Sequence, residues 1–220
     1  MKEIPILFNT EMVQAILEGR KTMTRRIIDP QPEVGEYPQT KLNGYYWKNK
    51  FYFTKYDRKD ISLVDNSRYG QPGDVLWVRE TFCLPSLYDG FEKDYYFKAG
   101  FSSSDIKDRN ASQSWKPSIH MPKVAARIWL QVEEIRVERL RDITQEDAIS
   151  EGIKFSRLFE EWGGVVPHPK VKDHYRWYAN PVDAFNNLWI HINGEESFKA
   201  NPWLWVVKFR VLSTTGKPSF

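Results

Sequence analysis

The order of the expected helices and strands constrains the fold of this chain more than any single motif. Helical patterns stand near the two ends of the chain, strand patterns fill its middle, and no strand–helix–strand unit repeats. A doubly wound parallel sheet requires that repetition. We therefore expect an α+β fold, in which a small mixed β-barrel carries short flanking helices and long loop insertions.

The first 20 residues carry the signals of a strand followed by a helix. Residues 4–8 are apolar and form a run of the length of a short buried strand. Asn9 or Thr10 can cap a helix that runs to about Glu18, and Gly19 is the residue type that ends a helix. The basic residues that come next are therefore expected directly after a helix C-terminus, where cations are favoured.

Later boundary signals complete the expected set of elements. Thr144 opens a pattern that resembles a capping box, which predicts a short helix ending near Gly152. Asn180, followed by proline, predicts the start of a longer helix that Gly194 closes. Strands are expected at residues 75–80, at 125–132, around residues 135–137, and at 203–212.

Three segments read as insertions into one domain that spans residues 1–220. The first, at about 30–72, is interrupted by Pro30, Pro32 and Pro38 and contains a plausible hairpin at 45–53 with its turn at Asn49-Lys50. The second, at about 84–118, is polar and includes a serine cluster at 102–104, with a possible strand at 95–97. The third, at about 154–179, is expected to be irregular.

Composition excludes several classes of protein. No apolar run approaches the roughly 20 residues of a membrane span, and the lone Cys83 rules out a disulfide within the chain. We therefore expect a cytoplasmic protein without a membrane partner. The net charge of +3 permits a local basic groove without demanding nucleic acid. The nine tryptophans favour a β-rich core, although a few could line a pocket that stacks a base.

Residues 19–26 concentrate groups that can carry chemistry. Lys21 offers an amine that can transfer protons, and Thr22 and Thr24 offer hydroxyls that can attack. Arg20, Arg25 and Arg26 can hold an anion. The alternative interpretation is a solvated basic face whose threonines satisfy backbone groups in a turn.

Four segments in order resemble the ASCH superfamily, whose fold is a β-barrel of the PUA type. They are residues 19–26, the strand at 73–80, the segment 143–153 and the closing strand at 203–212. Residues 115–122 and 201–203 resemble the longer ASCH proteins that are common in bacteriophages and prophages. The insertions have no counterpart in the small members of the superfamily.

The resemblance implies an activity and a set of residues. Small bacterial ASCH proteins are N4-acetylcytidine amidohydrolases, and their Arg-Lys-Thr-x-Thr-x-Arg pattern falls here on residues 20–26. Lys21 and Thr24 thereby inherit the lysine and nucleophile roles, and Glu151 takes the position of the catalytic glutamate. The implied enzyme removes an acyl group from a modified cytosine nucleoside and uses no cofactor. Other ASCH proteins are associated with RNA binding or RNA cleavage, so a non-catalytic reader of a modified base or RNA, and a ribonuclease, stay open as alternatives.

Further candidate contacts to the substrate lie outside the basic loop. Trp77 could stack on a base, although core packing is the alternative. Arg79 and Glu80 end a predicted barrel strand and could face the pocket or form a surface ion pair. His120 could contact the substrate or be structural. We expect no metal site, because His168, Asp173 and His174 lack a recognised ligand spacing.

Overall fold

The computed structural model describes residues 1–36, 43–48, 50–53, 61–84, 95–100, 114–167 and 175–219. The chain divides into two compact units. The first unit comprises Met1–Gly19, Gly73–Gln131 and Arg210–Phe220, and the second comprises Arg20–Pro72 and Val132–Phe209. Within the described ranges, no helix is long and apolar enough to cross a membrane.

The first unit is built on parallel and antiparallel strand pairing. Its strand β1 pairs in parallel with β6, and β6 pairs antiparallel with the beginning of β9, with Trp77 opposite Trp129. Asn9 caps α1 by accepting a 2.8 Å hydrogen bond from the backbone N–H of Met12, as predicted. The elements are β1 (Glu3–Leu7), α1 (Thr10–Leu17), β6 (Val75–Arg79), β7 (Phe82–Cys83), β8 (Tyr96–Phe97) and the start of β9 (Trp129–Arg139).

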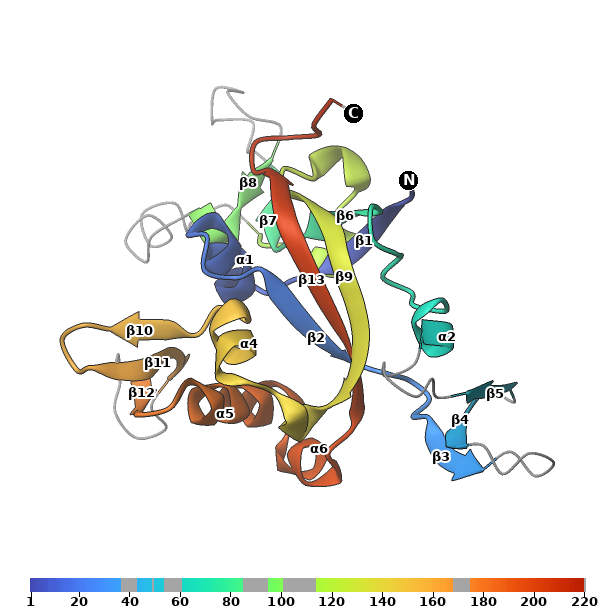
Figure 1. Cartoon of the computed structure of the whole chain (residues 1–220). Helices are drawn as coiled ribbons and strands as arrows, with labels where there is room; N and C mark the ends of the chain where they lie inside the picture. The colour runs from blue at the N-terminus through green and yellow to red at the C-terminus, as the bar shows by residue number, and fades with distance from the viewer. Residues whose placement is uncertain are drawn as a thin grey trace. The chain divides into compact units, whose positions relative to one another are not determined.

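The second unit contains the basic segment and most of the helices (Figure 1). Strands β2 and β13 run antiparallel, with Thr24 opposite Val207. Thr144 and Asn180 cap the helices that follow them, so both predicted helix starts are confirmed. The elements are β2 (Met23–Ile27), α4 (Gln145–Ser150), α5 (Pro181–Asn193), α6 (Glu195–Ala200) and β13 (Trp203–Ser213).

An apolar core fixes α4 and α5 beside β13. Ala148 of α4, Phe185 and Trp189 of α5, and Leu204 of β13 are all buried in one cluster. Burial of each of the larger side chains contributes about 1.5–3 kcal/mol to the stability of the fold. The cluster therefore holds the C-terminal end of α4 in place, and Glu151 follows directly after that end.

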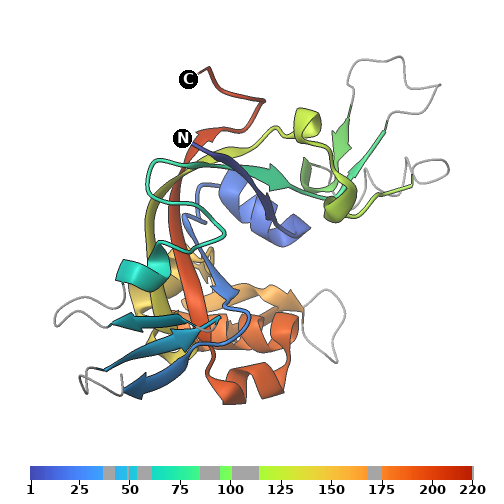
Figure 2. The ribbon, with the colours of Figure 1, turned by 90° about the vertical axis from the view of Figure 1, so that its right-hand side faces the viewer.

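The first predicted insertion contains a small antiparallel sheet of its own (Figure 2). Its strands are β3 (Glu33–Glu36), β4 (Asn43–Trp47) and β5 (Lys50–Phe53), and the short helix α2 (Ile61–Val64) contacts β5. The hairpin is confirmed, but Lys50 pairs with Trp47 as part of a strand and does not belong to the turn. Asn49, the other residue of the predicted turn, lies outside the described residues.

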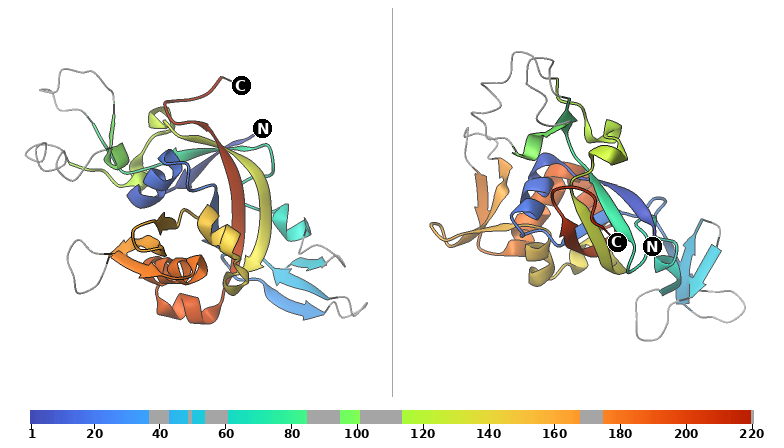
Figure 3. Two further views of the ribbon diagram at one scale, coloured as in Figure 1. Left: turned by 60° about the vertical axis from the view of Figure 1, so that its left-hand side comes forward. Right: turned by 90° about the horizontal axis from the view of Figure 1, so that it is seen from above.

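The prediction of an irregular segment at 154–179 is wrong. Strands β10 (Lys154–Ser156), β11 (Glu161–Pro167) and β12 (Tyr175–Tyr178) form an antiparallel sheet that contacts α5 (Figure 3). Trp162 and Tyr178 stand opposite each other and pack against the α5 core. These short strands gain their stability from that packing, which a local sequence pattern does not reveal.

The structure also corrects the expected strands between residues 125 and 137, and it adds a helix. The two strands predicted at 125–132 and 135–137 are one strand, β9, which begins only at Trp129 because Lys123–Ala125 form a 3-10 turn. Helix α6 was not predicted, since it is only six residues long and has no side-chain N-cap. Among the described strands, the main sheet has the order β1-β6-β9-β13-β2, a mixed five-stranded sheet with β1 and β2 at its edges. The fold is α+β, and its described strands do not close into a barrel.

A side chain at Gly163 of β11 would collide with the backbone of β12. The φ of Gly163 is +148°, and a Cβ built there would lie 2.2 Å from the carbonyl oxygen of Arg176. We expect Gly163→Ala to lower the free energy of unfolding by about 1–3 kcal/mol, because backbone atoms of β12 must move. Urea denaturation measures the loss. Gly100→Ala is the control, since its Cβ would meet only the side chain of Arg127 at 3.8 Å, and an equal loss there would contradict the steric argument.

Candidate active site

A backbone bridge brings the basic segment against the end of α4. Lys21 and Glu151 form an isolated antiparallel bridge, and the N–H of Thr22 donates a 2.9 Å hydrogen bond to the carbonyl of Ser150. Glu151 is the C-cap of α4, and Gly152 turns the chain away with φ +99°. Two segments 130 residues apart therefore meet at the start of β2, an edge strand of the main sheet.

Lys21 and Glu151 also form a buried ion pair. The ammonium of Lys21 donates to Glu151 Oε2 at 2.7 Å and to the Glu151 carbonyl at 2.9 Å. The exposed fraction of the side chain is 1% for Lys21 and 5% for Glu151. An ammonium in such surroundings loses its hydration, which disfavours the charged form.

The pKa of Lys21 is lowered from its ordinary value of 10.5 by the balance of several effects. Burial is the main cause, and Glu151 opposes it by attraction and by its hydrogen bond. The positive charges of Arg26 and Arg25 lower this pKa further. Lowering the pKa of a lysine raises the fraction of neutral amine at a given pH, and the neutral amine is the form that can act as a base.

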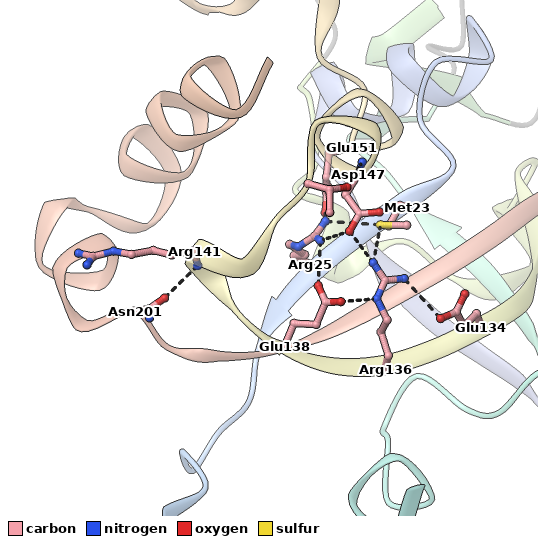
Figure 4. A network of polar contacts seen from close by, with 10 residues as sticks. Met23, Arg25, Glu134, Arg136, Glu138, Arg141, Asp147, Glu151 and Asn201 are labelled. Carbon is pink, nitrogen blue, oxygen red and sulfur yellow. Dashed lines mark hydrogen bonds and ion pairs between the residues drawn. The ribbon is translucent and has the colours of Figure 1, made fainter. Parts of the chain in front are cut away.

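Arg25 binds the second oxygen of the Glu151 carboxylate. Its Nη1 lies 3.4 Å from Glu151 Oε1, and its Nη2 lies 2.6 Å from Asp147 Oδ2 and 3.2 Å from Glu138 Oε2 (Figure 4). The Arg25 side chain is 1% exposed, and it lies 5.8 Å from the centre of the Phe185 ring. Glu151 is thus shared between two cations, Lys21 on one oxygen and Arg25 on the other.

Arg136 closes the network from strand β9. Its Nε donates to Glu138 Oε1 at 2.6 Å, and its Nη2 donates to Asp147 Oδ2. Arg25, Asp147, Arg136 and Glu138 therefore form a closed ring of alternating charges. With Lys21 and Glu151 the group holds three cations and three carboxylates, so its charges balance.

Sequence reasoning missed Arg136, Glu138 and Asp147. Asp147 was noticed only as part of the capping pattern, in which its N–H does donate to Thr144 Oγ1 at 3.2 Å. The available signal was the alternation along β9, where Ile135 and Val137 are buried and the charged residues lie between them. That alternation assigns Glu134, Arg136 and Glu138 to one face of the strand.

Thr24 lies one residue before Arg25 on β2 and is fully buried. Among the described residues, its hydroxyl has no hydrogen-bond partner. Alternation along the strand assigns Thr24 and Arg26 to the face opposite Met23 and Arg25. Lys21 precedes the strand, and the positive charges of Arg26 and Arg25, which lie on opposite faces, both lower its pKa.

The remaining residues of the basic segment hold the site to its surroundings. Arg20 donates to the carbonyl of Gly152. Thr22 is half-buried, and its carbonyl accepts a 2.9 Å hydrogen bond from the N–H of Phe209. Arg26 is half-buried, and burial, with Arg68, lowers its pKa. The segment is not the solvated basic face that was the alternative, because Lys21 and Arg25 are buried and paired.

Four of the expected substrate contacts belong to the first unit. Trp77 is buried in its core with Val75 and Trp129, and Glu80 is 1% exposed and forms a bidentate pair with Arg127 at 2.8 and 2.9 Å. The guanidinium of Arg79 donates to the carbonyl of Ile119 and lies 5.6 Å from the centre of the Trp77 ring. His120 is exposed, at the end of a 3-10 turn. Trp77 and Glu80 thus have core partners within their own unit.

The other acidic, histidine and cysteine side chains that the structure describes offer no metal site. Among the described residues, no group of three or more His, Cys, Asp or Glu side chains is placed to hold a metal ion. His168, Asp173 and His174 lie outside the described residues, as does the serine cluster at 102–104. Cys83 is buried.

Comparisons with protein families, with curated proteins and with solved structures found no match for this chain.

Proposed function

We propose that this protein is a cofactor-free amidohydrolase that removes the acyl group from a modified cytosine nucleoside of the N4-acetylcytidine type. The observation that carries the proposal is the buried contact of 2.7 Å between Lys21 Nζ and Glu151 Oε2. Three residues along the chain lies the hydroxyl of Thr24, which has no hydrogen-bond partner among the described residues. The resemblance to ASCH proteins assigns roles to the same three residues. The corresponding fold proposal is a PUA-type barrel, to which the mixed five-stranded sheet would belong.

The proposed reaction begins at Thr24. Lys21 in its neutral form takes the hydroxyl proton as Thr24 Oγ1 bonds to the acyl carbon. The bond from that carbon to the exocyclic nitrogen then breaks, and the nitrogen receives a proton from Lys21, which Glu151 orients. Water hydrolyses the resulting threonine ester, which releases the carboxylic acid and restores the hydroxyl. The net reaction consumes one water and yields cytidine and acetate.

Two features of Lys21 and Glu151 support these roles, and the burial of Thr24 sets a condition on substrate access. The lowered pKa of Lys21 provides a neutral amine at lower pH than an exposed lysine would. Glu151 fixes the amine by a carboxylate and a carbonyl contact, so the base is positioned before the substrate binds. Thr24 is 0% exposed, so neighbouring residues must move before a substrate reaches its hydroxyl.

The test is incubation of the purified protein with N4-acetylcytidine, followed by mass-resolved chromatography for cytidine. We expect cytidine from the wild-type protein and none from Lys21→Ala. We also expect kcat/KM to rise with pH, about tenfold per unit, up to a pKa below 10.5, because the neutral amine of Lys21 is the reactive form. A rate that falls as pH rises over this range would contradict lysine as the base.

The outcome also separates the alternatives. Absence of turnover, together with RNA binding that weakens steeply with salt, would replace the proposal with a non-catalytic RNA reader, because phosphate contacts release counterions. If the protein cleaves RNA and Thr24→Ala cleaves it equally well, the result would favour a ribonuclease that uses other groups.

A further inference from the structure

The Glu151 carboxylate is divided between two cations that compete for it. Lys21 binds Oε2 at 2.7 Å, and Arg25 binds Oε1 at 3.4 Å. Arg25 is itself held by shorter contacts on its other side, at 2.6 Å to Asp147 and 3.2 Å to Glu138. The strength of those outer contacts therefore decides how much of the positive charge of Arg25 acts on Glu151.

Arg136 controls the outer contacts in turn. It shares Asp147 Oδ2 with Arg25, and it binds the Glu138 oxygen that Arg25 does not use. Each carboxylate of the ring thus binds both guanidinium groups. A change of charge at Asp147 or at Arg136 must alter the field that Arg25 presents to Glu151 and Lys21.

We propose that Arg25 is a positioning residue, and that the ring it forms with Asp147, Arg136 and Glu138 sets how the Glu151 carboxylate is divided between Arg25 and Lys21. The proposal rests on the proposed function, in which Lys21 and Glu151 act on the substrate. Arg25 falls on a position that the Arg-Lys-Thr-x-Thr-x-Arg pattern leaves unspecified, and the other three ring residues lie outside that pattern.

The charge that faces Lys21 comes from every element packed around it. The end of α4 contributes Glu151, and β2 contributes Arg25 and Arg26, which both act on Lys21. Arg26 is influenced in turn by Tyr69 and Arg68. Behind Arg25 stand Asp147 from α4 and Glu134, Arg136 and Glu138 from β9.

Two variants that each remove one charge are expected to shift the pKa of Lys21 in opposite directions. In Asp147→Asn, Arg25 loses a carboxylate partner, so its charge acts more strongly on Glu151 and the pKa of Lys21 falls. In Arg136→Met, Asp147 and Glu138 are left to Arg25 alone, so Arg25 is drawn away from Glu151 and the pKa of Lys21 rises. We expect shifts of about 0.5–1 pH unit in each direction.

The experiment measures these shifts in two ways on the full chain. NMR with 13C-labelled lysine follows the titration of Lys21 directly, with its signal assigned by its loss in Lys21→Arg. The pH profile of kcat/KM with N4-acetylcytidine follows the same group during turnover. Glu134→Gln is the control, because Glu134 is 51% exposed and lies at 3.5 Å from Arg136 Nη1, so the shift of the Lys21 pKa should be smaller than in either variant.

Each result bears on one proposal. Opposite shifts in the NMR titration support the ring as a positioning device even if no hydrolysis occurs, in which case only the proposed function fails. Shifts in the same direction, or none, in folded variants overturn the inference even if the wild type hydrolyses the substrate. If the ring serves stability alone, both variants will have a lower free energy of unfolding, and the pKa of Lys21 will be unchanged in both.

Discussion

Lys21→Met is expected to lower the free energy of unfolding by about 3–5 kcal/mol at neutral pH. The substitution keeps the length and apolar stem of the side chain but removes the ammonium, which leaves the Glu151 carboxylate 5% exposed with Arg25 at 3.4 Å as its remaining ion-pair partner among the described residues. A buried carboxylate in that position has lost its shortest charge contact, of 2.7 Å, without regaining water. Urea denaturation followed by tryptophan fluorescence measures the loss.

Two companion variants identify the cause of that loss. Lys199→Met removes a lysine that also pairs with glutamates, but on the surface, where the side chains are 57–89% exposed. It should change the free energy of unfolding far less than Lys21→Met does, because exposed ion pairs contribute little to stability. The double variant Lys21→Met with Glu151→Gln removes the stranded charge and should recover part of the loss. If the double variant is no more stable than Lys21→Met, the penalty does not come from an uncompensated carboxylate.

The expected loss is also pH-dependent, with a sign that follows from the charge left behind. Acid favours the protonated form of any carboxyl group, and a neutral carboxyl group costs less to bury than a carboxylate. The difference between wild type and Lys21→Met should therefore shrink as the pH falls into the acidic range. A difference that grows on acidification would show that the ammonium, and not the carboxylate, dominates the energetics.

Local signals predicted the elements that position the candidate site. Asn9, Thr144 and Asn180 each cap a helix where the sequence placed one, because a cap depends only on the residues of one turn. The end of α4 near Gly152 was predicted for the same reason. The sequence does not predict the strand that carries Thr24 and Arg25, because its basic residues follow a helix-ending glycine and are expected to form a loop.

Contacts that depend on the register of distant segments could not be predicted from local patterns. Arg25 and Glu138 are 113 residues apart, and Arg25 and Asp147 are 122 apart. They meet because β2 and β9 belong to one sheet and α4 packs beside it, and no local pattern states that register. The sequence shows that the charges exist, but only the fold shows that they pair with one another.

The sheet of β10, β11 and β12 could not be predicted from local patterns for a related reason. Its strands are short, and Gly163 interrupts β11 with a φ that few other residues adopt. What stabilises it is the packing of Trp162 and Tyr178 on α5, a helix that starts only after the sheet ends. The sequence pattern of the sheet was therefore weak, while its tertiary contacts are extensive.

Thr24→Val is expected to abolish hydrolysis and to make the protein more stable. The hydroxyl of Thr24 is buried and unpartnered among the described residues, so folding removes it from water without a compensating hydrogen bond. Valine keeps the branched shape and omits the hydroxyl, which should raise the free energy of unfolding by about 1–2 kcal/mol. Loss of the nucleophile should lower kcat/KM for N4-acetylcytidine by about a thousandfold or more.

Thr24→Ser is the matched control for the chemistry. Serine retains a hydroxyl that Lys21 can deprotonate, so part of the hydrolysis should survive, while the lost methyl group leaves a small cavity and a less stable protein. The two variants should thus rank oppositely in activity and in stability. Full hydrolysis by Thr24→Val would show that another group attacks the acyl carbon. A loss of stability in Thr24→Val would mean that the hydroxyl has a partner in solution, and a gain in stability with lost turnover would identify Thr24 as a residue retained for its reactivity.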